Sequence, residues 1–184
     1  MSMRTWAHAA VIGAGLTMAA MGMAAAAELD PQNTLLMDVE GGRITIKLLP
    51  ELAPKHVTQM KKLVSRHFFD GQVFHRVIPD FMAQTGDPTG TGTGGSYEPN
   101  LPAEFTPTPY KRGTIGMART DDPNSANSQF FICFTDTSCA ALRGKYTVWA
   151  EVVKGMELVD KLAPGEPPEA PSRIVKVQLA ADAK

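Results

Sequence analysis

Short strand-like runs separated by turn residues fill most of this chain and limit the folds that it can adopt. Apolar and β-branched residues gather in each run, and Gly, Pro, Asn and Asp recur between the runs. Many short strands at this spacing are typical of a β-sandwich or a β-barrel. The seven predicted runs are Leu35–Val39, Arg43–Leu48, Gln72–Ile78, Gly113–Arg119, Ser128–Phe134, Thr147–Val153 and Ile174–Leu179.

A hairpin and two helices complete the predicted elements. Gly41 and Gly42 supply the positive φ that a tight turn between the first two runs needs. Pro54 suits a first helical turn, and apolar residues recur after it at helical spacing. They are Val57, Met60, Leu63 and Val64, while Lys55, Gln59, Lys61 and Lys62 fill the predicted solvent side. A second helix is predicted over Met156–Leu162 and is ended by Pro164.

The segment Pro164–Pro171 is predicted to be a loop before the last strand. It holds four prolines, which cannot donate to a sheet ladder. A closed barrel with the two helices as end caps would remove the edge strands and bury the apolar side of each helix. The strand pattern therefore favours a mainly β, barrel-type fold.

Length and charge indicate one domain without a nucleic-acid partner. The chain has 184 residues, of which 43% are hydrophobic and 20% are charged, and this balance is ordinary for a globular domain. The formal net charge is −1. Because a nucleic-acid binder normally carries a basic patch or stripe, the composition argues against that class of protein.

Residues 1–27 are predicted to be a secretory signal peptide, and residues 28–184 the mature domain. Arg4 is followed by an Ala-, Gly- and Met-rich apolar stretch that closes in four alanines before Glu28. This order of a positive region, an apolar region and small residues is that of a cleaved export signal. An uncleaved membrane anchor is the alternative, but the stretch holds few strongly apolar side chains. We expect no stable membrane insertion after cleavage.

Two cysteines, Cys133 and Cys139, remain in the predicted mature chain. Export would place them in an oxidising compartment, where disulfides form and persist. Two cysteines are too few to define a disulfide framework. A disulfide with a short loop and a pair of buried free thiols both remain open at this stage.

Motifs for other chemistries fail on their context. Residues 90–95 formally match G-x-G-x-x-G, but Pro99 and Pro102 follow where a dinucleotide site needs a helix. The histidines His56, His67 and His75 lack the spacing of a metal site. No serine or cysteine stands in the setting of an activated nucleophile. We therefore expect no metal and no cofactor.

Three segments carry a more specific signal. Residues 74–87 read FHRVIPDFMAQTGD, residues 113–119 read GTIGMAR, and residues 127–132 read NSQFFI. In these segments the chain closely resembles the cyclophilin family of peptidyl-prolyl cis–trans isomerases, and specifically its bacterial exported, periplasmic branch. The likeness extends from about Thr34 to Val177. It implies a closed eight-stranded antiparallel β-barrel capped by two α-helices, with the site on the outer face.

The resemblance also implies roles for individual residues. Arg76 matches the catalytic arginine of the family. The other positions that match the family bind substrate. A proline pocket is formed by Phe81, Met82, Phe131 and Leu142, and hydrogen-bonding positions fall on Gln84 and Gln129. A groove is formed by Gly92, Ala118, Arg119 and Thr120, with Tyr146 beside these residues. Phe130 is expected in the core, because it alternates with Phe131 along a strand.

Two departures bear on ligand preference. Ala141 and Tyr146 stand where the animal members of the family carry Trp and His. The expected activity is isomerisation of X–Pro bonds in unfolded or partly folded proline-containing polypeptides during folding of exported proteins. We expect a monomer in the periplasm, with secretion as an alternative. A binding module that holds extended proline segments without turnover is the competing function, and an intact Arg76 argues against it.

Overall fold

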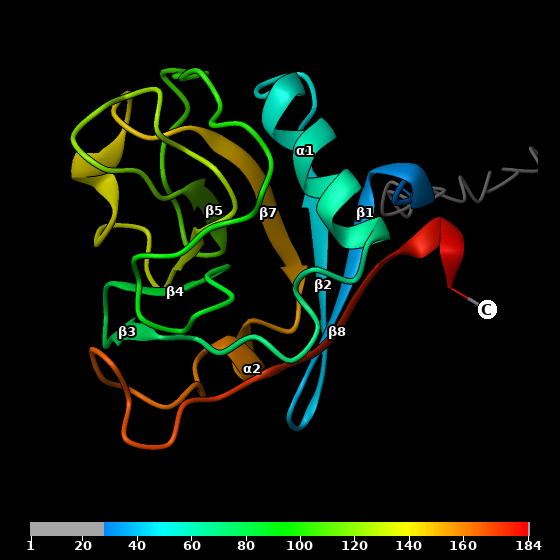
Figure 1. The fold of residues 1–184 in the computed structure, drawn as a ribbon, viewed down its shortest axis with the longest axis vertical. Helices are drawn as coiled ribbons and strands as arrows, with labels where there is room; N and C mark the ends of the chain where they lie inside the picture. The colour runs from blue at the N-terminus through cyan, green and yellow to red at the C-terminus, as the bar shows by residue number, and fades with distance from the viewer. Residues whose placement is uncertain (1–27, 184) are drawn as a thin grey trace, which may run out of the picture.

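A computed structural model describes residues 28–183, so the predicted signal peptide lies outside the described residues. The strands are β1 (Thr34–Val39), β2 (Gly42–Leu48), β3 (Arg76–Ile78), β4 (Met82–Thr85), β5 (Thr114–Met117), β6 (Phe130–Cys133), β7 (Val148–Lys154) and β8 (Ile174–Leu179). The α-helices are α1 (Pro54–Ser65) and α2 (Met156–Val159). Figure 1 shows a strongly curved sheet with long loops on one side.

The eight strands form one antiparallel sheet in the order β3-β4-β6-β5-β7-β2-β1-β8. The expectation of a closed barrel is wrong, because the sheet is a curled half-barrel with β3 and β8 as its edges. Among the described residues, isolated bridges, Val73 to Arg173 and Val77 to Gly165, join the two edge regions in place of a continuous ladder. β3 is three residues long, and the proline-rich segment before β8 lacks the N–H groups that a ladder would need.

The helices lie near opposite ends of the sheet (Figure 1), with α1 against β7 and β8 and α2 against β2. α2 is shorter than the predicted Met156–Leu162 and ends at Val159, although Leu162 remains buried. The helical spacing predicts a solvent-facing Gln59, but this residue is buried. Its amide nitrogen donates to the carbonyls of Pro99 and Asn127, so this face of α1 anchors two loops instead of meeting water.

β4 was not among the predicted strands, and the predicted run Gln72–Ile78 is a strand only from Arg76. Asp80 has a positive φ of 59°, and the turn there reverses the chain between β3 and β4. A four-residue strand directly after such a turn has too little alternation to be recognised. Pro164–Pro171 is a loop, as predicted.

β6 has apolar side chains on both faces. Phe130 and Ile132 lie in the main core, which confirms the prediction for Phe130. Phe131 and Cys133 point to the other side, into a second apolar cluster with Met82. Because side chains alternate along a strand, one short segment supplies both the core and the floor of an outer pocket.

Cys133 and Cys139 are joined in a disulfide in the structure, with Cα atoms 6.2 Å apart. Both residues are fully buried in the second apolar cluster. The bond therefore lies in the same apolar cluster as Met82 and Phe131. This pairing is one of the two alternatives that the sequence leaves open.

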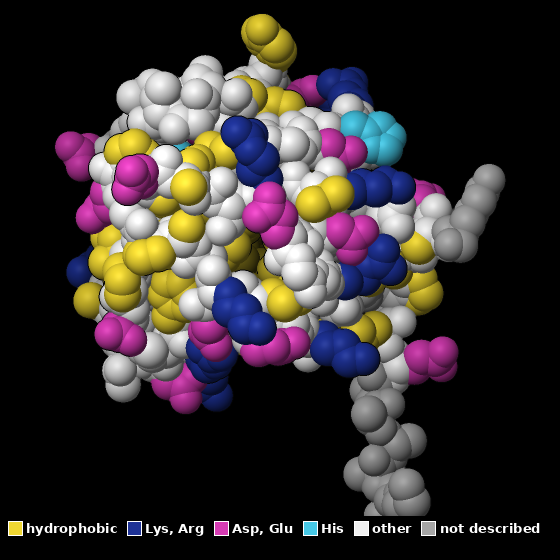
Figure 2. All heavy atoms as spheres, turned by 90° about the horizontal axis from the view of Figure 1, so that it is seen from below, with side chains coloured by type: hydrophobic (Ala, Val, Ile, Leu, Met, Phe, Trp, Pro, Cys, Tyr) yellow, Lys and Arg dark blue, Asp and Glu magenta, His cyan; other side chains and the backbone are white. Residues whose placement is uncertain are grey.

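Within the described residues, no helix combines the length and hydrophobicity that crossing a membrane requires. On the face of the described chain seen in Figure 2, acidic and basic side chains are interspersed with apolar ones. That face therefore does not have the single-sign charge that typifies a nucleic-acid surface.

Candidate active site

The twelve residues singled out by the resemblance line two cavities that share Gln84, Ala118 and Arg119. The smaller cavity, about 300 Å³, is called the apolar pocket after the side chains of Phe81, Met82, Phe131 and Leu142 in its lining. It is lined by Arg76, Phe81, Met82, Gln84, Ala118, Arg119, Phe131, Leu142 and Tyr146. The larger cavity, about 550 Å³, is called the polar groove and also contains Gly92, Thr120 and Gln129. The structure thus brings all twelve residues into one continuous site.

Phe131 forms the centre of the apolar pocket, and aromatic packing fixes its ring. Tyr110 stacks on it with ring centroids 6.0 Å apart, and Tyr146 meets it edge to face at 5.7 Å. Gly116 lies opposite Phe131 in the β5–β6 register, and a Cβ there would collide with the Phe131 ring. The Phe131 ring is thereby held in one orientation, which suits contact between its face and another ring. Sequence reasoning missed Tyr110, which comes from a loop with no strand or helix pattern.

Arg76 is placed by the antiparallel pairing of β3 with β4, in which it lies opposite Gln84. Its side chain is 40% exposed, and its Nε donates to Oε2 of Glu166 at 2.6 Å. The guanidinium therefore stands at the edge of the apolar pocket, with an acidic partner on one side. Glu166 also escaped the sequence analysis, because it is 90 residues away along the chain.

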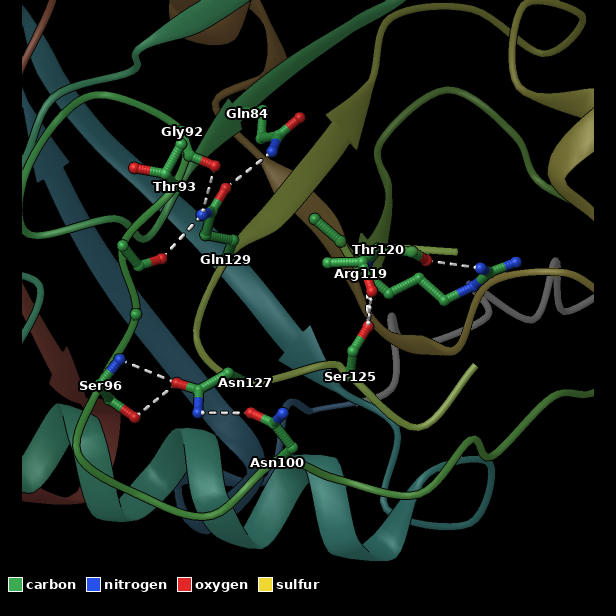
Figure 3. A pocket seen from close by; sticks show the side chains of 13 residues that line it. Gln84, Gly92, Thr93, Ser96, Asn100, Arg119, Thr120, Ser125, Asn127 and Gln129 are labelled. Carbon is green, nitrogen blue, oxygen red and sulfur yellow. Dashed lines mark hydrogen bonds between the residues drawn. The ribbon is translucent and has the colours of Figure 1, made fainter. Parts of the chain in front are cut away.

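A chain of amide hydrogen bonds joins the two cavities (Figure 3). The Gln84 side-chain nitrogen donates to Oε1 of Gln129 at 2.8 Å. The Gln129 nitrogen in turn donates to the carbonyls of Gly92 and Gly94 at 3.0 and 2.8 Å. The hydrogen bond from its nitrogen fixes the orientation of the Gln84 amide. Its side-chain oxygen accepts no hydrogen bond from another described residue and can serve as an acceptor within the site.

Asp87 organises the glycine-rich loop that forms one wall of the polar groove. Its carboxylate is 1% exposed and accepts backbone N–H groups from Thr89, Thr91, Gly92 and Gly94. Burial acts to raise the pKa of Asp87, but these bonds and the Thr89 hydroxyl outweigh it and lower the pKa to about 2. The residues that matched G-x-G-x-x-G are thus wrapped around a side chain of this protein.

His75 lies beneath this loop, with its Cδ2 3.5 Å from the position of a Cβ on Gly92. The ring is 5% exposed, and neither ring nitrogen has a hydrogen-bond partner among the described residues. Burial lowers the pKa of His75, so the ring is neutral near pH 7. It packs beneath the glycine-rich loop, outside the lining of both cavities, and is not arranged as a general acid or base.

Arg119 lines both cavities, but backbone carbonyls occupy its guanidinium. It donates to the carbonyls of Lys145, Thr120 and Asp121, and its Cζ lies 4.6 Å from the centre of the Tyr146 ring. The guanidinium therefore holds the backbone segments at the rim of the site together. Thr120 is held at the same rim, where its backbone N–H and hydroxyl both contact Oγ of Ser125 (Figure 3).

Several residues of the polar groove were missed by the sequence analysis. Asn127 is the most connected of them: its Oδ1 accepts from the backbone and hydroxyl of Ser96, and its Nδ2 donates to Asn100 (Figure 3). The same Nδ2 also donates to the Glu98 carbonyl. Asn127 stands in the NSQFFI segment, so its position there was the available signal. The groove residues not predicted are Thr93, Gly94, Gly95, Ser96, Asn100, Ser125 and Asn127.

Within residues 28–183, no cluster of His, Cys, Asp or Glu is arranged to hold a metal ion. The site combines an apolar pocket large enough for a small ring, a polar groove of backbone and amide groups, and the guanidinium groups of Arg76 and Arg119. The fold and site together define an elongated groove on the outer face of a curled antiparallel sheet, with concave walls of the kind that ligand sites have. This arrangement suits an extended chain that places one apolar ring in the pocket.

Comparison with known proteins identifies the family. The family model described as cyclophilin type peptidyl-prolyl cis-trans isomerase/CLD matches residues 34–179. A relative from Brucella suis, named "Probable peptidyl-prolyl cis-trans isomerase", is 47% identical over 97% of each chain. A peptidyl-prolyl cis-trans isomerase from Acinetobacter baylyi is 35% identical over 80% of this chain and 86% of its own. The chain therefore belongs to the cyclophilin family and is a peptidyl-prolyl cis–trans isomerase.

Solved structures agree with this assignment. The crystal structure of a cyclophilin from Hirschia baltica has a TM-score of 0.76 and 28% identity, covering 85% of this chain and 77% of that one. A cyclophilin-type isomerase from Cryptosporidium parvum, crystallised in the presence of the dipeptide Ala-Pro, has a TM-score of 0.73 and 26% identity. That match covers 79% of this chain and 98% of the other.

Proposed function

We propose that Arg76 accelerates X–Pro isomerisation by stabilising the twisted amide of a substrate whose proline ring lies in the apolar pocket. Rotation about a peptide bond costs about 18–20 kcal/mol because amide resonance is lost. In the twisted state the ring nitrogen regains a lone pair, which a guanidinium can contact. A planar amide offers no such acceptor, so the interaction favours the transition state over both ground states.

The observation that carries this proposal is the placement of Arg76 in the lining of the apolar pocket, together with Phe81, Met82 and Phe131. The reaction breaks no bond, so it needs neither a nucleophile nor a metal. Gln84 would hold the substrate backbone through its side-chain amide. Each tenfold acceleration corresponds to about 1.4 kcal/mol of transition-state stabilisation. A preoriented cation in a partly desolvated pocket can stabilise the transition state by more than this amount.

Substitution of Arg76 tests this role. Arg76→Ala should lower kcat/KM roughly a hundredfold or more in a protease-coupled assay on an X–Pro peptide. Arg76→Lys should recover only part of the rate, because an ammonium lacks the planar guanidinium fork. Arg66→Ala is the matched control, since Arg66 is also an exposed arginine paired with a carboxylate but lies outside the pocket. A folded Arg76→Ala protein with near-normal turnover would remove Arg76 from the mechanism and favour a binding module.

We further propose that the protein is exported and acts in the periplasm as a monomer on proline-containing polypeptides that are still folding. The pattern of residues 1–27 supports export, and the disulfide between Cys133 and Cys139 suits an oxidising compartment. N-terminal sequencing of protein from the native host should find Glu28 as the first residue. Light scattering should give the mass of one chain. Membrane-bound protein that begins at Met1 or Ser2 would contradict export with cleavage.

A further inference from the structure

The loop between α2 and β8 is fixed to the edge of the sheet beside Arg76. Val77 donates its backbone N–H to the Gly165 carbonyl at 2.8 Å, and Gly165 donates back to Val77 at 2.9 Å. Gly165 has a φ of +143°, and a Cβ there would lie 2.6 Å from Cα of Pro168. Only glycine fits at this bridge, so the loop can approach β3 closely.

The bridge places Glu166 directly across from Arg76. In an antiparallel pair, the residue before one member lies opposite the residue after the other, with Cβ atoms about 5 Å apart. The pairing of Val77 with Gly165 therefore aligns Arg76 with Glu166, and the β3–β4 register aligns Arg76 with Gln84 on its other side. Three chain segments thus place Glu166, Arg76 and Gln84 in one row.

The contact engages only one side of the guanidinium. Nε of Arg76 donates to Oε2 of Glu166 at 2.6 Å, and its two terminal nitrogens make no hydrogen bond to other described residues. Arg76 lines the apolar pocket, whereas Glu166 is not among the lining residues. The carboxylate thus engages Nε from outside the lining of the pocket and leaves the two terminal nitrogens of Arg76 without a partner among the described residues.

We propose that Glu166 is a positioning residue that orients Arg76 for the reaction, an inference that rests on the proposed role of Arg76. An exposed arginine side chain samples many rotamers, and ordering it in the transition state costs free energy. A charge-assisted hydrogen bond to a carboxylate on an anchored loop fixes one orientation before substrate arrives. A preorientated charge lowers the barrier more than a mobile one, because no reorganisation accompanies the reaction.

The test compares wild type with Glu166→Gln, Glu166→Asp and the matched control Glu169→Gln. Glu169 is an exposed carboxylate on the same loop that makes no hydrogen bond or ion pair with another described residue, so its substitution makes the same change in charge. Glu166→Gln should lower kcat roughly three- to tenfold with KM changed less than about twofold, since misplacing a reacting group slows the chemical step. Glu166→Asp should keep part of the wild-type kcat, because it retains a carboxylate near Arg76. Glu169→Gln should have the wild-type kcat and KM.

A double substitution separates positioning from a general effect of charge. In an Arg76→Ala background, Glu166→Gln should change the rate no further, because the group that it positions is gone. The exposed ion pair between Arg76 and Glu166 contributes little to the free energy of unfolding. The single and double variants should therefore remain folded. Equal rates for Glu166→Gln and Glu169→Gln, a faster Glu166→Gln enzyme, or an undiminished effect without Arg76 would each overturn the inference.

The two proposals fail in different ways. An active Arg76→Ala protein would refute the role of Arg76 itself. An inactive Arg76→Ala protein together with an unaffected Glu166→Gln protein would refute only the positioning role of Glu166.

Discussion

Replacing Asp87 with Asn should destabilise the protein and loosen the polar groove. The carboxylate of Asp87 accepts the N–H groups of Gly92 at 2.6 Å and of Thr91 and Gly94 at 3.1 Å through one oxygen, and that of Thr89 at 2.8 Å through the other. The amide nitrogen of Asn must replace one of these oxygens, so at least one buried N–H would face another donor. An unpaired buried group and weaker remaining bonds together cost about 2–4 kcal/mol.

The pKa of Asp87 leads to a similar magnitude by a separate route. It is about 2 in the folded protein, below the ordinary value of 3.8. At about 1.4 kcal/mol for each pKa unit, this difference corresponds to roughly 2.5 kcal/mol. Because the folded pKa is depressed, the stabilisation is fully present above pH 3.8 and is lost as the pH falls through about 2. The stability gap between wild type and Asp87→Asn should therefore narrow from pH 4 to pH 2.

Urea denaturation at several pH values measures the difference in the free energy of unfolding between wild type and Asp87→Asn. The pH dependence due to the other carboxylates cancels in this difference, because both proteins contain them. Near neutral pH the melting temperature should fall by roughly 5–15 °C. The KM for a peptide should rise about three- to tenfold, because Gly92 and Gly94 no longer hold Gln129 in place. Asp121→Asn is the control, since Asp121 is exposed at the rim. An Asp87→Asn protein as stable as Asp121→Asn, or a gap independent of pH, would refute the reasoning.

Three further outcomes are expected. Gly116→Ala should cost about 1–3 kcal/mol and raise KM, because the added methyl displaces the Phe131 ring; unchanged peptide kinetics would count against this. Non-reducing mass spectrometry of exported protein should find Cys133 bonded to Cys139, and replacing either should cost about 2 kcal/mol; two free thiols would contradict the bond. By the resemblance to animal cyclophilins, the Trp at the place of Ala141 contacts the drug cyclosporin, so calorimetry should find weaker cyclosporin binding here; Ala141→Trp should tighten it, and affinity equal to that of the animal enzymes would refute the prediction.

Local sequence patterns were sufficient for the elements that depend on neighbouring residues. The alternation in β1 and β2, the two glycines between them and the helical spacing after Pro54 each specify a local structure. β4 was missed because four residues after a turn carry little periodic signal. The predicted Met156–Leu162 helix ran too far, since Leu162 is buried without being helical.

The site was predictable where its residues lie in short, specific segments. Arg76, Gln84 and Phe131 come from two such segments, and the structure brings them together through the β3–β4 and β4–β6 registers. Asp87 belongs to the first segment, but nothing in its surroundings indicated that it would accept the N–H groups of four residues. That function depends on how the glycine-rich loop folds back on itself.

The sequence alone determined the residue types of the site and the strand-rich character of the fold, because these follow from local alternation and specific motifs. Only the tertiary structure decided that the sheet stays open between β3 and β8, since that depends on how a proline-rich loop meets a three-residue strand. It also decided that Glu166 pairs with Arg76. A single glycine bridge creates this contact between distant residues, and no spacing along the chain encodes it.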